Sequence, residues 1–425
     1  MTAGDTRAAM RAAWIAWTPA ALFFLYGFFN RTAPAVMADD LMQSFAVGGA
    51  LLGNLAAFYF YAYASIQIAV GVLVDNFGPR RIFTAAALLT GAGAILFGSA
   101  DTLHEAYLGR LLVGIGAGFS WVSCLALIAA RFPPRRFAFT AGLTTLVGMI
   151  GAAGGQAPLA LAVEAYGWRT PMIATGLAGV ALAALCWLLI RDKAAPPRGD
   201  APARHFLHGL GLAARNQQTW IVALFTGAQI APFLGLTSLW VVPYLMQVHA
   251  MARTEAALLA MAMIGGLAAG GPSLGWFSDR IGRRKPAMFL ALAGQAVGLT
   301  LAFHMPHASV AITAVGLGIT GFFASGIIIG FATAREASGV EATGVASGIV
   351  NTAVIGGGAA IQPAIGALLD GAWDGMERAG VRLYSAAAYE GAFLSLHAAL
   401  AVGLLAALFV RETYCGAHNA PTARP

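Results

Sequence analysis

The chain contains the stretch Gly71-Val-Leu-Val-Asp75-Asn-Phe-Gly78-Pro-Arg80-Arg81, and its second half contains a close copy, Gly275-Trp-Phe-Ser-Asp279-Arg280-Ile-Gly282-Arg283-Arg284-Lys285. The glycines and aspartates of the two copies share one offset (275 − 71 = 279 − 75 = 204), which is close to half of the 425 residues. Each copy is a short charged segment between long apolar segments. A repeat of this size in a hydrophobic chain predicts two related halves in a membrane.

The composition excludes a soluble protein. Hydrophobic residues make up 59% of the chain, charged residues 10%, and the mean hydropathy is +0.74. Soluble domains carry about 25% charged residues, so this chain cannot cover a water-facing surface and we predict an integral membrane protein. The net charge is +7, but no basic patch with interleaved aromatic residues occurs, and we expect no nucleic-acid partner. The three cysteines show neither a disulfide nor a metal-ligand spacing, and we expect no metal site.

Twelve membrane spans are expected, because a spanning helix needs about 20 largely apolar residues. They form two groups of six, at 14–37, 49–74, 82–99, 106–130, 138–164 and 171–190, and at 219–245, 255–277, 286–304, 309–334, 343–368 and 388–410. The domains expected from this pattern are a six-helix bundle over 1–190 and a second over 219–425. The segment 191–218 between them is rich in Pro, Arg and Ala, as a cytoplasmic linker would be.

Lysine and arginine are distributed unevenly among the loops. One set of loops holds 19 of the 25, and the opposite set holds 4, namely Arg169, Arg253, Arg378 and Arg382. The remaining two, Arg31 and Arg110, fall within spans. Because cytoplasmic loops carry the excess of positive charge, we expect both termini in the cytoplasm of a protein in the cytoplasmic (inner) membrane.

Each copy of the repeated motif joins two expected helices through a tight turn. Gly78 and Gly282 supply the backbone freedom that such a turn needs, while Gly71 and Gly275 leave room for a neighbouring helix to pack closely. The basic residues hold the loops on the cytoplasmic side, and these residues are Arg80, Arg81, Arg280, Arg283 and Arg284.

The motif aspartates, Asp75 and Asp279, need partners in so apolar a setting. Candidates occur at the same offset, because Arg131 follows one expected span and Arg335 another (335 − 131 = 204). We therefore expect the ion pairs Asp75–Arg131 and Asp279–Arg335. Such pairs can act as latches that break when the halves rock; the alternative is that these residues only fix topology and loop shape.

The motif resembles the loop signature G-x-x-x-D-R-x-G-R-R of the major facilitator superfamily. The second copy matches it fully, whereas the first has Asn76 in place of the arginine and Pro79 before its basic pair. A second feature similar to the family is Arg-x-x-x-Gly-x-Gly, present as Arg110, Gly114 and Gly116. The resemblance covers essentially the whole chain. It implies two six-helix bundles around a central cavity, lined by spans 1, 4, 7 and 10, with alternating access by rocking.

Arg31 is the lead candidate for substrate binding. An arginine at a helix centre costs about 2.5–3.5 kcal/mol on insertion scales, so it is a functional candidate by default. The alternative is that it snorkels to the outer interface. The stretch 30–41, which begins with Asn30 and Arg31, is similar to span one of the anion:cation symporters, and this similarity implies that the arginine holds an anionic substrate.

The acidic residues point to the same preference. None of the 18 Asp and Glu residues falls at the middle of an expected span. A cavity with a buried cation and no buried carboxylate should prefer anions. It also lacks a protonatable acid, so coupling to an H⁺ or a Na⁺ gradient is left open, and no bound cofactor is expected. Arg110 matches the family's coupling-associated position, but a packing role is an equal alternative.

Further polar residues are expected to line the cavity. Tyr59, Tyr63 and Gln67 recur at four-residue spacing and share one helix face, although aromatic stripes also arise from packing. Single buried polar residues are candidates for substrate contacts or for hydrogen bonds between helices, and these are Trp121, Gln156, Gln229 and Asn351.

The sequence thus predicts an all-α, twelve-span secondary transporter of a small organic anion, a carboxylate, that works by alternating access. One alternative is an efflux antiporter for hydrophobic compounds. Another is a transport-inactive receptor that keeps the fold. No catalytic constellation is present and we do not expect an enzyme. The expected partners are the lipid bilayer and a small-molecule substrate, with the protein as a monomer.

Overall fold

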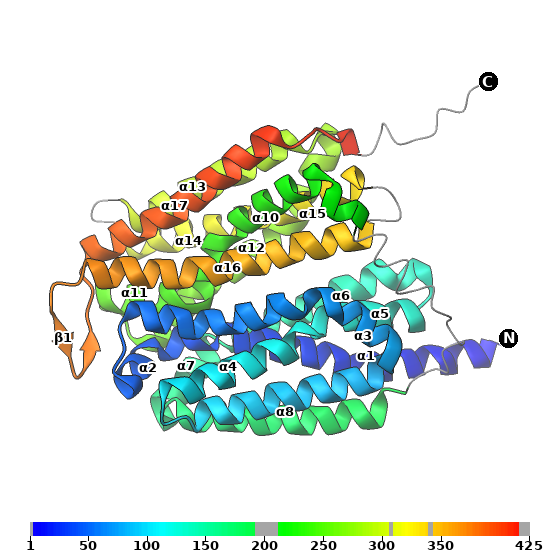
Figure 1. Ribbon diagram of the computed structural model, residues 1–425, viewed down its shortest axis with the longest axis horizontal. Coiled ribbons are helices and arrows are strands. Elements are labelled where there is room, and N and C mark those ends of the chain that lie inside the picture. Colours follow the sequence, from blue (N-terminus) through cyan, green and yellow to red (C-terminus); the bar gives the residue numbers. More distant parts are fainter. Residues whose placement is uncertain (1–2, 192–210, 306–308, 339–342, 416–425) are drawn as a thin grey trace. The chain divides into compact units, whose positions relative to one another are not determined.

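The computed structural model describes residues 3–191, 211–305, 309–338 and 343–415 (Figure 1). The chain divides into two compact units, each described here by itself. Unit 1 comprises Met1–Pro197, Ser238–Leu258 and Asp374–Leu383, and unit 2 comprises Arg198–Thr237, Leu259–Trp373 and Tyr384–Pro425. Most of the expected linker, residues 192–210, lies outside the described residues.

Unit 1 is built from the N-terminal helices and two segments from the second half of the sequence. Its helices are α1 (Ala3–Thr32), the 3₁₀ helix η1 (Ala33–Met37), α2 (Ala38–Phe45), α3 (Gly49–Gly98), α4 (Leu103–Gly118), α5 (Ser120–Arg131), α6 (Pro134–Gly154), α7 (Ala157–Tyr166), α8 (Arg169–Leu189) and α11 (Val241–Val248). Strands β1 (Glu377–Arg378) and β2 (Val381–Arg382) pair in an antiparallel hairpin, and each strand has two residues.

Unit 2 contains the remaining helices. These are α10 (Gln217–Gly235), α12 (Arg253–Ile281, whose first residues belong to unit 1), α13 (Lys285–Phe303), α14 (Val310–Ala324), α15 (Ile327–Ala337), α16 (Thr343–Gly371) and α17 (Ala386–Phe409). The π-helical segment η2 (Leu236–Trp240) follows α10 and crosses from unit 2 to unit 1. Within unit 2, α10 packs against α15, α16 and α17.

Helices predominate because hydrocarbon offers no partner for backbone polar groups, which a helix satisfies internally. Within the described residues, eleven helical segments are long and apolar enough to span a membrane. The span predicted at 49–74 is the first arm of α3, which is not among the eleven. Gly78 breaks α3 into two arms with a φ of 78°, a backbone angle that glycine adopts at low cost. The second motif glycine, Gly282, likewise has a positive φ, of 64°.

The Arg-x-x-x-Gly-x-Gly feature allows α4 to pack closely on α3. A Cβ added at Gly114 would collide with the backbone oxygen of Tyr59, and one added at Gly116 would collide with the hydroxyl of Thr90. Close backbone approach through small residues is the usual basis of helix packing in membranes. This contact brings Arg110, one turn before Gly114, next to α3.

Candidate anion site and charged helix ends

Arg31 occupies the last turn of α1, directly before the change to the 3₁₀ helix η1. The candidate span continues past this point, from Met10 to Phe45, so Arg31 does not lie at the end of an apolar segment. Its guanidinium carbon lies 3.9 Å from the centroid of the Phe28 ring. The ring therefore covers one face of the guanidinium, as in a cation–π contact.

The half-buried guanidinium of Arg31 has no acceptor. In the part of the chain that the structure describes, it makes no hydrogen bond or ion pair, and its Nε is buried without a partner. Its electrostatic neighbours are the phenols of Tyr59 and Tyr63, with no acid among them. Because arginine carries five N–H donors and stays charged, this arrangement can bind an anion.

Arg110 lies beside the same segment of α1. It is 1% exposed, and its Nη1 donates to the backbone oxygen of Asn30 at 2.8 Å while Nη2 reaches that of Ala56 at 3.5 Å. Its guanidinium carbon is 5.1 Å from the Tyr59 ring centroid. The side chain of Asn30 is fully buried, its amide donates to the backbone oxygen of Tyr26, and its predicted contact with substrate stays a prediction.

The tyrosine stripe is buried between helices of unit 1. Tyr59 and Tyr63 are 2% and 8% exposed, with ring centroids 5.9 Å apart. The Tyr59 hydroxyl donates to the backbone oxygen of Gly27 at 3.3 Å, and Gln67 donates to that of Gly118 at 3.0 Å. These bonds join α3 to α1 and to α4. The stripe therefore packs helices together, which was the alternative given for it in the sequence analysis, and it also lies beside Arg31.

The other predicted polar residues are spread over both units. Trp121 is partly buried in α5, and Gln156 is fully buried before α7. In unit 2, the fully buried Gln229 donates to the side-chain oxygen of Gln295 at 2.6 Å, which is a hydrogen bond between α10 and α13. Asn351 is partly buried in α16. Their roles as substrate contacts stay predictions.

The second motif copy is the centre of a polar network in unit 2. Arg284, which is 7% exposed, donates to Asp279 at 2.7 Å, to Ser278 at 3.0 Å and to both carboxylate oxygens of Glu336 at 2.6 and 3.2 Å. The bonds to Glu336 raise the pKa of Arg284 further above its ordinary value. The expected pair Asp279–Arg335 is wrong for this structure, because Arg284 reaches Asp279 from the same turn and Arg335 lies exposed.

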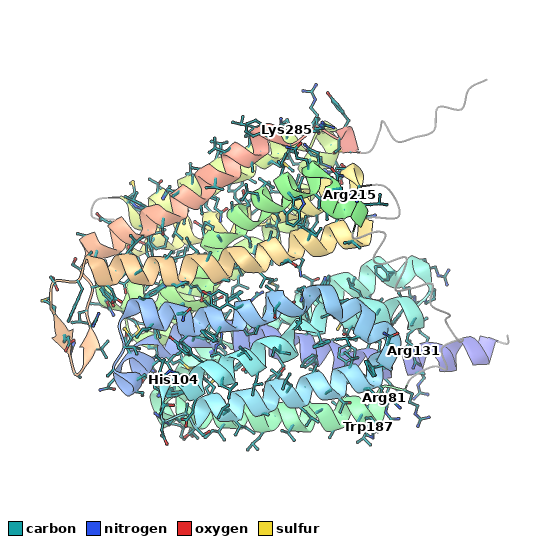
Figure 2. The ribbon with its side chains drawn as sticks, in the orientation of Figure 1. Arg81, His104, Arg131, Trp187, Arg215 and Lys285 are labelled. Carbon is teal, nitrogen blue, oxygen red and sulfur yellow. The ribbon has the colours of Figure 1, made fainter. Side chains whose placement is uncertain are left out.

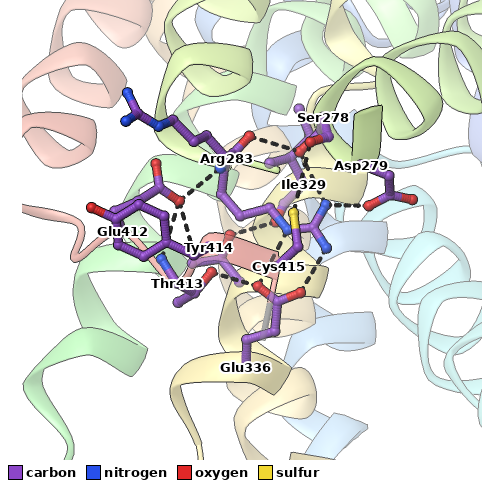
Figure 3. A network of polar contacts seen from close by, with 11 residues as sticks. Ser278, Asp279, Arg283, Ile329, Glu336, Glu412, Thr413, Tyr414 and Cys415 are labelled. Atoms are coloured by element: carbon purple, nitrogen blue, oxygen red, sulfur yellow. Dashed lines mark hydrogen bonds and ion pairs between the residues drawn. The ribbon is translucent and has the colours of Figure 1, made fainter. Parts of the chain in front are cut away.

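The residues after α17 fold back onto this network (Figure 3). The Glu412 carboxylate accepts from the backbone N–H groups of Arg284 at 2.7 Å and Lys285 at 3.0 Å, at the start of α13, and from those of Thr413 and Tyr414. Burial opposes ionisation here, but these four bonds outweigh it and lower the pKa of Glu412. The four hydrogen bonds of the Glu412 carboxylate therefore stabilise the folded protein at neutral pH, and this stabilisation is lost as pH falls through the lowered pKa of Glu412.

Basic residues of both motif copies bind the end of the last helix of their own bundle. Arg80 donates to the backbone oxygen of Trp187 in α8 at 2.8 Å and stacks on its ring at 3.9 Å. Lys285 donates to the backbone oxygen of Leu408 in α17 at 2.9 Å. Figure 2 shows Arg81 and Trp187 at the same end of unit 1. Cations at helix C-termini satisfy free carbonyls and complement the helix dipole.

Two other contacts expected of the motif involve Asp75 and Gly275. The side chain of Asp75 lies outside the described residues, so the pair Asp75–Arg131 stays a prediction; Arg131 donates to the backbone oxygen of Arg191. Close helix packing at Gly275 is not found, since a Cβ there would meet no described atom within 4 Å.

A second charged cluster lies at the other end of unit 1. Arg253 forms an ion pair with Asp40 at 2.7 Å, and the backbone N–H of Thr254 donates to Glu164 at 3.1 Å. These contacts attach the start of α12 to α2 and α7. Asp40 comes nine residues after Arg31, and only η1 and the first residues of α2 separate them. The sequence analysis placed Arg253 in a loop and no acid at the middle of a span, and it offered no signal that Asp40 and Arg253 pair.

Neutralising this pair should loosen the packing around η1. We expect D40N or R253Q to speed maleimide labelling of a cysteine placed at Val36, which is 2% exposed, about 5- to 30-fold, since a partly buried pair contributes about 1–2 kcal/mol. The measurement uses detergent-solubilised protein with Cys415 replaced by serine. The charge swap D40R/R253D should restore slow labelling, and D101N, in an exposed turn, should not change it. Fast labelling in the swapped protein would show that pairing is not what holds η1.

Comparison with known proteins decides the family. Residues 20–249 and 233–424 both match the Major Facilitator Superfamily, so nearly the whole chain is covered by two successive matches. The chain belongs to the Major Facilitator Superfamily. This confirms the resemblance drawn from the motif copies and the expected all-α membrane fold of two halves.

Curated relatives within the superfamily differ in what their names state. The chain is 28% identical to the membrane sensor protein UhpC of Salmonella typhimurium, over 79% of each protein. It is 25% identical to the probable sulfoacetate transporter SauU of Cupriavidus necator, over 92% of this chain and 91% of SauU. It is also 25% identical to an MFS-type efflux pump of Mycolicibacterium smegmatis, over 66% of each.

Solved structures of the superfamily share the fold at low identity. A bacterial homologue of the human lysosomal transporter Spinster, solved in an inward-facing and unoccupied conformation, aligns with a TM-score of 0.74 at 18% identity, covering 95% of this chain and 96% of that chain. A point mutant of the nucleoside transporter NupG aligns with a TM-score of 0.76 at 12% identity, covering 93% of this chain and 99% of that chain. At these identities the likeness concerns the fold of this transporter-family member.

Proposed function

We propose that this member of the superfamily carries a small organic anion with a carboxylate group across the cytoplasmic membrane by alternating access, with Arg31 as the binding residue. The observation that carries the proposal is the half-buried, unpaired guanidinium of Arg31 inside a candidate span. An uncompensated charge at such a position is costly, and a bound anion removes that cost.

The surroundings of Arg31 support the same choice. Phe28 covers one face of the guanidinium, so an anion approaches its edge, where two parallel N–H donors suit the two oxygens of a carboxylate. The phenols of Tyr59 and Tyr63 are near enough to interact electrostatically with this charge. The probable sulfoacetate transporter SauU, similar over 92% of this chain, is named for an organic anion with a carboxylate.

Reconstitution in liposomes tests the proposal. Uptake of radiolabelled lactate, succinate, sulfoacetate, glutamate and tetraphenylphosphonium is measured with and without imposed H⁺ and Na⁺ gradients. We expect saturable uptake of at least one organic anion and none of the lipophilic cation. Movement of tetraphenylphosphonium without any anion would overturn the proposal in favour of efflux of hydrophobic compounds. The gradients identify the coupling ion.

A receptor function is the second candidate, because UhpC, a membrane sensor protein, is 28% identical over 79% of this chain. A receptor with this fold would bind an anion at Arg31 without moving it. Binding that protects the protein against thermal denaturation, together with no flux of any tested compound, would identify this case.

A further inference from the structure

We infer that Arg110 is a positioning and specificity-determining residue, which holds the segment carrying Arg31 and makes the site selective for dianions over monoanions. The inference rests on the proposed function of Arg31 as the anion-binding residue. It begins from the position of Arg110, whose buried guanidinium donates at 2.8 Å to the backbone oxygen of Asn30, the residue before Arg31.

The hydrogen bond acts where α1 changes its geometry. Thr32 ends α1 and the 3₁₀ helix η1 follows at once, so backbone oxygens in this turn are available to partners outside the helix. Arg110 binds one of them from α4, and its Nη2 reaches the backbone oxygen of Ala56 in α3. The side chain of Arg110 thus connects α4 to α1 and α3 at the residue before Arg31. It therefore holds the backbone from which the Arg31 side chain extends.

The charge of Arg110 is as uncompensated as that of Arg31. Both of its described hydrogen-bond partners are neutral backbone oxygens, its Nε is buried without a partner, and no acid is among its electrostatic neighbours. Tyr59 interacts electrostatically with both arginines, which places the two charges around one ring. Like charges in a medium of low dielectric repel each other strongly.

A bound anion relieves that repulsion, and a dianion relieves more of it than a monoanion. A monoanion at Arg31 leaves one net positive charge in the buried site, whereas a dianion leaves none. Because buried charges are costly unless compensated, Arg110 should favour the doubly charged form of one and the same compound. The substrate class that fits is a small molecule with a carboxylate and a second acidic group.

The experiment compares pairs of probes that differ by one charge. Sulfoacetate and succinate are each measured against their monomethyl esters in proteoliposomes, and the dianion-to-monoanion ratio of kcat/KM is determined for the natural protein, R110Q and R110K. We expect the natural protein to prefer the dianions. The dianion-to-monoanion ratio should be about tenfold lower in R110Q and within about twofold of the natural value in R110K. Because each ratio is taken within one preparation, loss of folded protein cancels.

The outcomes separate this inference from the proposed function. A ratio unchanged in R110Q overturns the role of Arg110, and so does a natural protein that carries lactate or the monomethyl esters as well as the dianions. In both cases Arg31 remains the binding residue. Absence of flux for every anion instead removes the proposed function, and the inference about Arg110 with it.

Discussion

Replacing Arg31 with glutamine is expected to lower the kcat/KM for anion uptake about 100-fold, which corresponds to about 2.7 kcal/mol. The reason is that the guanidinium supplies charge-assisted hydrogen bonds of about 1.5–3 kcal/mol that a neutral amide cannot replace. R31K keeps the charge but not the two parallel donors, so an intermediate loss of about tenfold is expected. Uptake into proteoliposomes measures all three proteins.

Thermal stability distinguishes a binding charge from a structural one. Arg31 makes no hydrogen bond or ion pair within the described residues, so R31Q removes an uncompensated charge and should leave the midpoint of thermal denaturation unchanged or raise it. Stability that rises as activity falls is the usual signature of a residue kept for function. The matched control is R135Q, which replaces an exposed arginine of α6. It should change neither the midpoint of thermal denaturation nor the uptake. Full uptake by R31Q would contradict the proposed site.

Replacing Arg284 with glutamine should destabilise the protein by about 1.5–3 kcal/mol, the contribution of charge-assisted hydrogen bonds, because Arg284 is buried and its partner Glu336 is partly buried. Glu336 would then lose the two hydrogen bonds from Arg284, at 2.6 and 3.2 Å, while the one from Thr413 would stay, and Asp279 would lose its ion pair. Glu412 would keep its bonds, because these come from backbone N–H groups. Each variant is heated in detergent, and size-exclusion chromatography measures the fraction of protein that stays folded. This fraction reports the loss of stability.

The matched control for this variant lies next to Glu336. R335Q makes the same substitution at an exposed arginine for which the described residues provide no ion pair, and its effect should stay within about 0.5 kcal/mol. The double variant R284Q/E336Q should recover part of the loss, because it also removes the carboxylate that R284Q leaves without its arginine. Equal losses in R284Q and R335Q would show that net charge at this end, rather than the network, stabilises unit 2.

The sequence alone determined the class of the protein and the position of its lead residue. A charged fraction of 10% and long apolar segments leave helices as the structure that satisfies the backbone in lipid. The repeated motif indicated two halves, and its turn glycines, Gly78 and Gly282, have the positive φ that the turn needs. Arg31 was found because a charge inside an apolar segment is conspicuous without any knowledge of its neighbours. Phe28 was missed, although its spacing of three residues from Arg31 on one helix was a usable signal.

The partners of the charges were decided only by the tertiary structure. Two arginines at matched repeat positions suggested the pair Asp279–Arg335, yet Asp279 pairs with Arg284. The bond from Arg110 to Asn30 and the pair of Asp40 with Arg253 join residues far apart in the chain. Hydropathy depends on what a segment contains, and so it can be read along the chain. An ion pair depends on helix rotation and packing to within about 1 Å, which only the folded chain fixes.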